Sequence, residues 1–131
     1  MNPISIGKLS SATSVNIEAI RYYEREGILP EPLRNQGGWR IYFGEDVKRL
    51  KFIHKCRELG FSLKEIKSLL SLVYSGNFTC KEVHDLTLEH AKKIHQKISN
   101  LKKMEAVLVE MASQCSRENV PDCPIVDSLY H

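Results

Sequence analysis

Three of the four cysteines in this 131-residue chain bracket a long uninterrupted segment, a pattern that suits metal or redox chemistry. Cys80 precedes the segment, Cys115 follows it, and Cys123 lies beyond a proline-containing loop. Thiolates are the ligands that soft metal ions prefer. Disulfides are rare in the cytoplasm, where we expect this chain because it begins without a basic segment followed by an apolar run. The sequence therefore predicts a thiolate metal site, with plain burial of each cysteine as the alternative.

The segment between the first two of these cysteines is expected to be one long helix. Residues 81–113 contain neither glycine nor proline, and Ile94, Leu101 and Leu108 recur every seven residues. Apolar residues also occupy the positions between them, until Glu105 interrupts the pattern. Such a stripe suits a coiled-coil-like pairing with a second copy of the chain. The alternative is a helix that folds back on the N-terminal part of its own chain.

The length of this helix decides where a metal ion can bind. The 35 residues from Cys80 to Cys115 span roughly 50 Å in a continuous helix, whereas a zinc–sulfur bond is only about 2.3 Å long. An antiparallel dimer removes the conflict, because it places Cys80 of one subunit beside Cys115 of the other. Cys123 can fold back to join them. We therefore predict an intersubunit site, with Cys115 and Cys123 from one chain and Cys80 from its partner.

Three thiolates without a histidine in the Cys115–Cys123 loop indicate the class of ion. Mercury(II), lead(II) and cadmium(II) suit this donor set, whereas zinc normally takes four ligands and copper(I) needs only two thiolates. His84, His90 and His95 do not share a helix face with one another, so we expect them to be solvated or packed. No nucleophile–base set, phosphate-binding loop or carboxylate pair is present, and the sequence therefore does not predict an enzyme.

The N-terminal quarter of the chain has the pattern of a helix-turn-helix. One helix is expected to begin after Ser5 and a second after Asn16, since both residues are good N-caps. The second helix carries Arg21, with Tyr22 and Tyr23 beside it. These residue types contact phosphates and base edges when a recognition helix enters the major groove of DNA. The alternative is that one of the tyrosines belongs to the core and the arginines are merely solvated.

Residues 30–43 are expected to form a β-wing. Gly37 and Gly38 are a hairpin signal, and the residues after them alternate like a short strand. Arg40 and Tyr42 on this wing could contact the DNA backbone. Residues 1–60 hold ten Lys and Arg against seven Asp and Glu, so the net charge of +3 resides in the part with these motifs. The prediction is a protein that binds double-stranded DNA.

The predicted fold class is mainly α, in three parts. A winged helix-turn-helix DNA-binding domain covers residues 1–75, a linker and long antiparallel dimerisation helix covers 76–113, and a metal-binding loop with a short terminal helix covers 114–131. No apolar run approaches the roughly 18 residues of a membrane span, which excludes an integral membrane protein. The predicted DNA-binding residues are Lys8, Asn16, Arg21, Tyr22, Tyr23, Arg40 and Tyr42.

Several motifs resemble the MerR family of transcription regulators, and the resemblance spans nearly the whole chain. They lie at residues 6–9, 20–24, 27–29, 40–42 and 59–66. The C-terminal half is similar to the mercury-responsive members, in which three cysteines at positions matching Cys80, Cys115 and Cys123 bind Hg(II) across the dimer. Copper-type members resemble the chain but carry serine at the first position, and zinc-type members usually add a cysteine and a histidine near the second. The Cys115–Cys123 loop is one residue shorter than in typical mercury members, which leaves lead or cadmium as alternatives. Zinc is kept as a further alternative effector.

The resemblance also implies a mechanism. A homodimer binds a promoter whose spacer is too long for RNA polymerase, and metal binding tilts the winged domains so that the DNA is bent and untwisted. This requires a two-state element that the metal binds unequally. Two rival functions keep the same motifs: a thiol redox switch within Cys115 and Cys123, and a metal buffer for which DNA binding is incidental.

Overall fold

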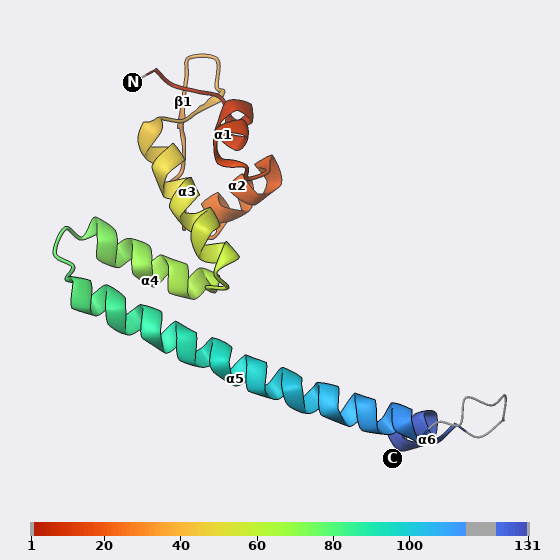
Figure 1. The fold of residues 1–131 in the computed structure, drawn as a ribbon. Coiled ribbons are helices and arrows are strands. Elements are labelled where there is room, and N and C mark those ends of the chain that lie inside the picture. The colour runs from red at the N-terminus through yellow and green to blue at the C-terminus, as the bar shows by residue number, and fades with distance from the viewer. Residues whose placement is uncertain (1, 115–122, 131) are drawn as a thin grey trace. The chain divides into compact units, whose positions relative to one another are not determined.

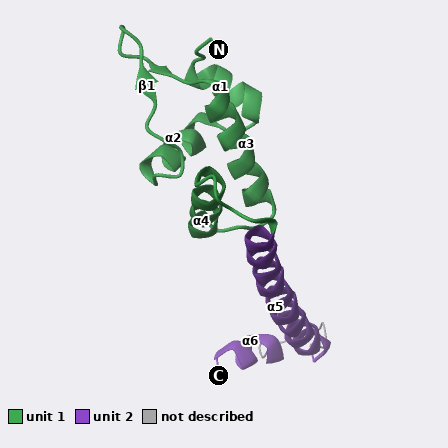
Figure 2. Cartoon of the chain, turned by 90° about the vertical axis from the view of Figure 1, so that its left-hand side faces the viewer, with its two compact units in different colours: residues 1–80 green, residues 81–131 purple. Residues whose placement is uncertain are grey.

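The computed structural model describes residues 2–114 and 123–130, and these are mainly helical (Figure 1). The chain forms two compact units, residues 1–80 and residues 81–131 (Figure 2). The first unit contains four helices and a small hairpin, and the second contains a long helix and a short one. The mainly helical class predicted from the sequence is confirmed.

The first two helices, α1 (Ile6–Thr13) and α2 (Ile17–Arg25), begin where their caps predict. The side chains of Ser5 and Asn16 each accept a hydrogen bond from a backbone N–H of the first turn. These bonds satisfy donors that an N-terminus otherwise leaves unpaired. Ser14 adopts the left-handed conformation, with a φ of 61°, and this makes the tight turn between the helices.

The predicted wing is present, although its strands are short. Strand β1 (Leu33–Arg34) pairs antiparallel with β2 (Arg40–Ile41) over its full length. Gly38 has a φ of 81° at the turn, a conformation that favours glycine. Beyond β2, the backbone of Tyr42 forms an isolated antiparallel bridge with Ile4, which ties the N-terminal segment to the wing.

Two further helices, α3 (Gly44–Glu58) and α4 (Leu63–Tyr74), complete the first unit. A capping box begins α4, as the three-residue spacing of Ser62 and Glu65 predicts. Ser62 Oγ accepts from the Glu65 N–H at 3.2 Å, and Glu65 Oε1 accepts from the Ser62 N–H at 2.9 Å. Helix α1 packs against α2 and α3, and α3 packs against α4.

The core of the first unit lies where these helices and the wing meet. One apolar expectation on α3 is wrong: the periodicity predicts Leu59 on its buried face with Leu50 and Ile53, yet Leu59 is 63% exposed. The helix ends at Glu58, so the next residue no longer follows the helical repeat. Cys56 is buried as expected, and burial raises the pKa of its thiol. The most deeply buried side chains are Leu9, Ile20, Leu29, Tyr42, Leu50, Ile53 and Ile66.

The second unit confirms the long helix. Helix α5 (Cys80–Ser113) runs for 34 residues, and the short α6 (Pro124–Tyr130) follows beyond the segment that is not described. The predicted stripe on α5 is exposed in this single chain, with Ile98 at 46% and Leu101 and Leu108 both at 61%. Among the described residues, no helix is both long enough and apolar enough to cross a membrane.

Candidate DNA-contacting surface and metal ligands

Helix α2 separates its two predicted tyrosines onto different faces. Arg21 and Tyr22 are exposed, whereas Tyr23 keeps only 9% of its surface and belongs to the core. The alternative that one tyrosine is a core residue is therefore confirmed for Tyr23. The guanidinium carbon of Arg25 lies 5.9 Å from the centre of the Tyr22 ring, a cation–π contact that helps to orient the exposed ring.

Lys8 on α1 and Asn16 before α2 are both exposed. The side-chain oxygen of Asn16 already accepts from the Ala19 N–H at 2.7 Å. Its amide nitrogen therefore remains as the donor group for an outside partner. The two positions therefore leave one cation on α1 and one amide at the start of α2 open to solvent.

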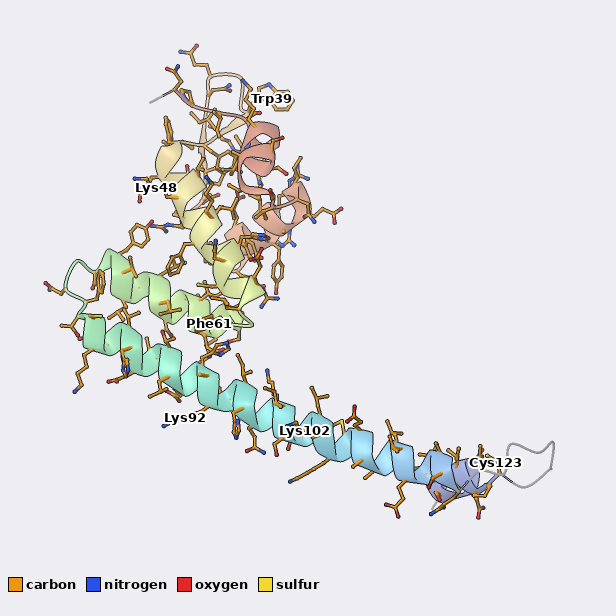
Figure 3. The ribbon with its side chains drawn as sticks, in the orientation of Figure 1. Trp39, Lys48, Phe61, Lys92, Lys102 and Cys123 are labelled. Carbon is orange, nitrogen blue, oxygen red and sulfur yellow. The ribbon has the colours of Figure 1, made fainter. Side chains whose placement is uncertain are left out.

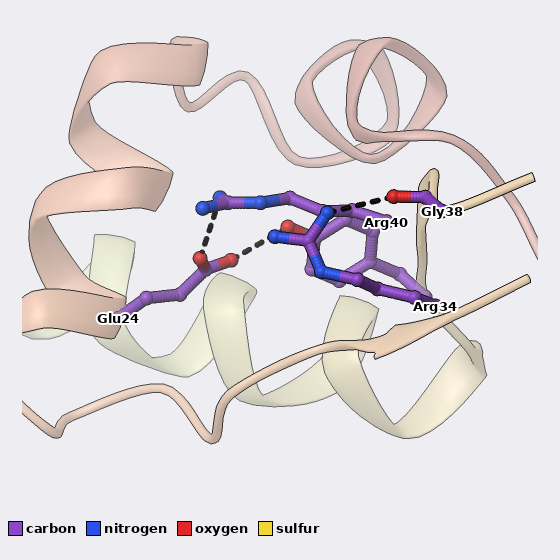
Figure 4. Close-up of polar contacts among 5 residues, drawn as sticks. Glu24, Arg34, Gly38 and Arg40 are labelled. Atoms are coloured by element: carbon purple, nitrogen blue, oxygen red, sulfur yellow. Dashed lines mark hydrogen bonds and ion pairs between the residues drawn. The ribbon is translucent and has the colours of Figure 1, made fainter.

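A buried carboxylate joins α2 to the wing (Figure 4). The side chain of Glu24 is only 7% exposed. It accepts from Arg40 Nη1 at 2.7 Å and from the Tyr42 hydroxyl at 2.6 Å. A buried charge needs such partners, since an unpaired one would be costly. The network therefore fixes the wing against α2.

This network changes the roles expected for the two wing residues. Tyr42 is 1% exposed, so its ring lies inside the protein and not on an outer surface. Arg40 keeps 30% of its side chain exposed while one guanidinium nitrogen is held by Glu24. The sequence placed both residues on one short strand but gave no sign of the carboxylate between them.

The wing also supplies two residues that sequence reasoning did not single out. Arg34 Nη1 donates to the Gly38 carbonyl at 2.7 Å, across the hairpin turn. Trp39 is 75% exposed, and its backbone N–H donates to Asn35 Oδ1 at 3.0 Å. The available signal was the Arg34-Asn35 pair, which only Gln36 separates from the two glycines of the hairpin.

A groove of about 780 Å³ lies among the N-terminal segment, α2 and the wing. Arg21, Arg34 and Arg40 all line it, together with Trp39. Guanidinium groups bind phosphate oxygens with strong, directional hydrogen bonds, and contacts to the phosphate backbone position a protein on DNA. The groove therefore has the chemistry of a backbone-binding surface.

The cysteines predicted to bind a metal lie far apart in one chain. Cys80 is exposed and is the first residue of α5, whereas Cys123 is half-buried and lies at the C-terminal end of α5 (Figure 3). A 34-residue helix is about 50 Å long. Cys115 lies outside the described residues. The described part of the chain contains no group of three or more His, Cys, Asp or Glu residues that could hold a metal ion.

Comparisons with known proteins agree on one family. Residues 4–72 match the model of MerR HTH family regulatory proteins, and residues 47–111 match the model described as MerR, DNA binding. The mercuric resistance operon regulatory protein of Bacillus cereus is 40% identical over 125 residues, which cover 95% of each chain.

Two solved structures resemble the whole chain. The transcription regulator PbrR691 of Ralstonia metallidurans, in complex with lead(II), has a TM-score of 0.84 at 33% identity and covers 96% of this chain and 98% of its own. The transcriptional regulator MerR of Bacillus megaterium, in complex with mercury(II), has a TM-score of 0.74 at 37% identity, with coverage of 98% and 100%. These similarities confirm the helix-turn-helix fold class.

The buried Tyr42 predicts a loss of stability at high pH. Burial, followed by the hydrogen bond to Glu24, raises the pKa of Tyr42 from 10.0 to about 12. Between these values the unfolded chain ionises this group while the folded protein keeps it protonated. The unfolding free energy should therefore fall as pH rises from 10 to 12, by on the order of 2 kcal/mol.

Urea denaturation across this pH range checks the prediction. Tyr42→Phe lacks the ionising group and should show a smaller fall, while Tyr22→Phe, which alters an exposed ring, should behave like the wild type. An equal fall in Tyr42→Phe and the wild type would contradict the assignment.

Proposed function

This chain belongs to the MerR family of helix-turn-helix regulators, and on that premise we propose that it is a cytoplasmic activator that responds to mercury(II). As a homodimer it binds promoter DNA, and on binding Hg(II) it distorts the DNA so that RNA polymerase transcribes a metal-resistance operon. The observation that carries this proposal is the placement of Cys80 and Cys123 at opposite ends of one 34-residue helix.

The exposed stripe of α5 supports an antiparallel homodimer. The register that sets Cys80 opposite Cys115 of the second subunit also sets Ile94 opposite Leu101, so apolar residues meet near the middle of the pair. A parallel pair would set Cys80 against its own copy and leave the other thiols about 50 Å away. Only the antiparallel pair brings three different cysteines to each end.

The three thiols suit the proposed ion. Cys80 is exposed and Cys123 is half-buried, so both are open to a metal, whereas Cys56 is buried with a raised pKa and is not a ligand. The ion would join the start of α5 in one subunit to the end of α5 in the other. Similarity to a mercuric resistance regulator favours Hg(II). Similarity to a lead-bound regulator keeps Pb(II), and with it Cd(II) and Zn(II), as alternatives.

The DNA-contacting surface is proposed to consist of the exposed face of α2 and the groove beside the wing. Arg21 and Tyr22 would face the major groove, while Lys8, Asn16 and the half-exposed Arg40 would contact the backbone. Tyr23 and Tyr42, which the sequence also predicts to contact DNA, are buried, so we propose that they support this surface from the core and do not touch DNA. Bending of DNA between two such surfaces is a form of readout through deformation.

Serine at any one of Cys80, Cys115 or Cys123 should abolish Hg(II)-dependent transcription in vitro and leave operator affinity unchanged, because none of the three is among the residues proposed to contact DNA. Cys56→Ser is the matched control and should keep induction. Loss of operator binding in all three variants would show that the cysteines are structural. Induction by an oxidant with metals chelated would instead favour the redox switch.

Arg21→Ala should weaken operator binding by about tenfold or more, since one good base or phosphate contact contributes about 1–3 kcal/mol. Lys48→Ala is the control, because Lys48 is exposed on the side of α3 that faces away from α1 and α2 (Figure 3). Both variants lose one positive charge. Equal losses of affinity in a footprinting titration would contradict the proposed surface, and Hg(II) binding should be unchanged in both.

A further inference from the structure

The N-terminal end of α5 contains a second metal-ligating side chain besides the cysteine. Helix α5 begins at Cys80, and His84 follows four residues later on the same helix. Side chains with this spacing have Cβ atoms about 5–6 Å apart. Zinc binds sulfur at about 2.3 Å and imidazole nitrogen at about 2.0–2.1 Å, so both side chains can reach one ion.

The pair also lies on the stripe that the proposed dimer turns toward its partner. The stripe advances in alternating steps of four and three residues through Ala91, Ile94 and Ile98. Extended toward the N-terminus, the same steps pass through Thr87 to His84 and Cys80. His95 directly follows a stripe residue, so it lies about 100° around the helix from the stripe. Of these two histidines, His84 is the one on the face of Cys80.

The contacts of His84 leave its outer ring nitrogen available. Its side chain is 65% exposed, and Nδ1 lies 3.2 Å from Asp85 Oδ1. In the tautomer that donates from Nδ1 to this carboxylate, Nε2 carries the lone pair that a metal would use. Metal-binding histidines commonly have such a carboxylate partner.

We propose that His84 is a fourth ligand of the intersubunit site and widens its response to ions that prefer four ligands. The inference rests on the proposed function, which supplies Cys115 and Cys123 of the second subunit. Three thiolates and one imidazole form a donor set that zinc accepts in tetrahedral sites. Mercury(II), which is satisfied by thiolates alone, does not need the imidazole. His84 therefore sets the affinity for Zn(II) and Cd(II) and leaves that for Hg(II) unchanged.

The test uses the full-length protein and the ions themselves. Wild type, His84→Gln, His95→Gln and Cys80→Ser are titrated with Zn(II), Cd(II) and Hg(II) against a competing chelator. X-ray absorption then counts the sulfur and nitrogen ligands of each bound ion. His84 is exposed, so its replacement should leave the fold intact, and circular dichroism checks this.

The inference expects three sulfurs and one nitrogen around Zn(II) and Cd(II) in the wild type and in His95→Gln. In His84→Gln the nitrogen should be lost and Zn(II) affinity should fall about tenfold or more, since even an outer-shell partner of a ligand contributes about 10–100-fold. Hg(II) affinity should not change.

Two results would overturn the inference in distinguishable ways. If His84→Gln keeps the nitrogen ligand or the Zn(II) affinity, His84 is not a ligand, although the thiolate site stands. If Cys80→Ser binds all three ions as tightly as the wild type does, the intersubunit thiolate site itself is wrong and the proposed function fails with it.

Discussion

The structure depends on the rigidity and length of one helix. Helix α5 has 34 residues without a glycine or proline to bend it, so the thiols at its two ends cannot meet within one chain. An isolated helix with an exposed apolar stripe is also marginal in water. In the proposed antiparallel dimer, a second copy would cover the stripe and supply the missing ligands of the metal site. Metal binding is then inseparable from the geometry of the dimer, and this makes the helix pair suitable as a lever between metal and DNA.

In the DNA-binding unit, a buried hydrogen-bond network fixes the position of the wing relative to α2. A single buried carboxylate, Glu24, holds Arg40 and Tyr42 of the wing against the helix that carries Arg21. Buried polar networks of this kind lock one arrangement, because any other leaves a charge unpaired. The wing and α2 therefore present their exposed groups at a fixed spacing. The proposed distortion of DNA requires such a rigid connection, since a loosely held wing would not transmit a movement of the dimer to the DNA.

The features that could be predicted from the sequence depend on interactions between residues close to one another in the chain. The caps at Ser5, Asn16 and Ser62 act within one helical turn, so the starts of their helices follow from a few residues. The long helix follows from a pattern repeated over many residues. The burial of Tyr23 and Tyr42 could not be foreseen in this way, because it depends on which elements pack against them.

The other differences between the predicted and the observed structure also depend on how elements end and pack, which local sequence does not show. The wing strands are shorter than the alternation after Gly38 implies, because pairing ends where the chain bridges to Ile4. Leu59 is exposed because α3 ends one residue earlier, and a period cannot show where a helix stops. The pairing of Cys80 with His84 was available in the sequence, but its meaning required knowing that α5 begins at the cysteine.

Mixed dimers test the intersubunit site most directly. One chain carries Cys80→Ser, and the other carries both Cys115→Ser and Cys123→Ser. Each is examined alone and after mixing, with an excess of a competing small thiol. The account predicts that neither homodimer retains Hg(II), whereas the mixed dimer retains one ion, because the intact Cys80 of one chain meets the two intact thiols of the other. Failure of mixing to restore binding, or tight binding by either homodimer alone, would contradict it.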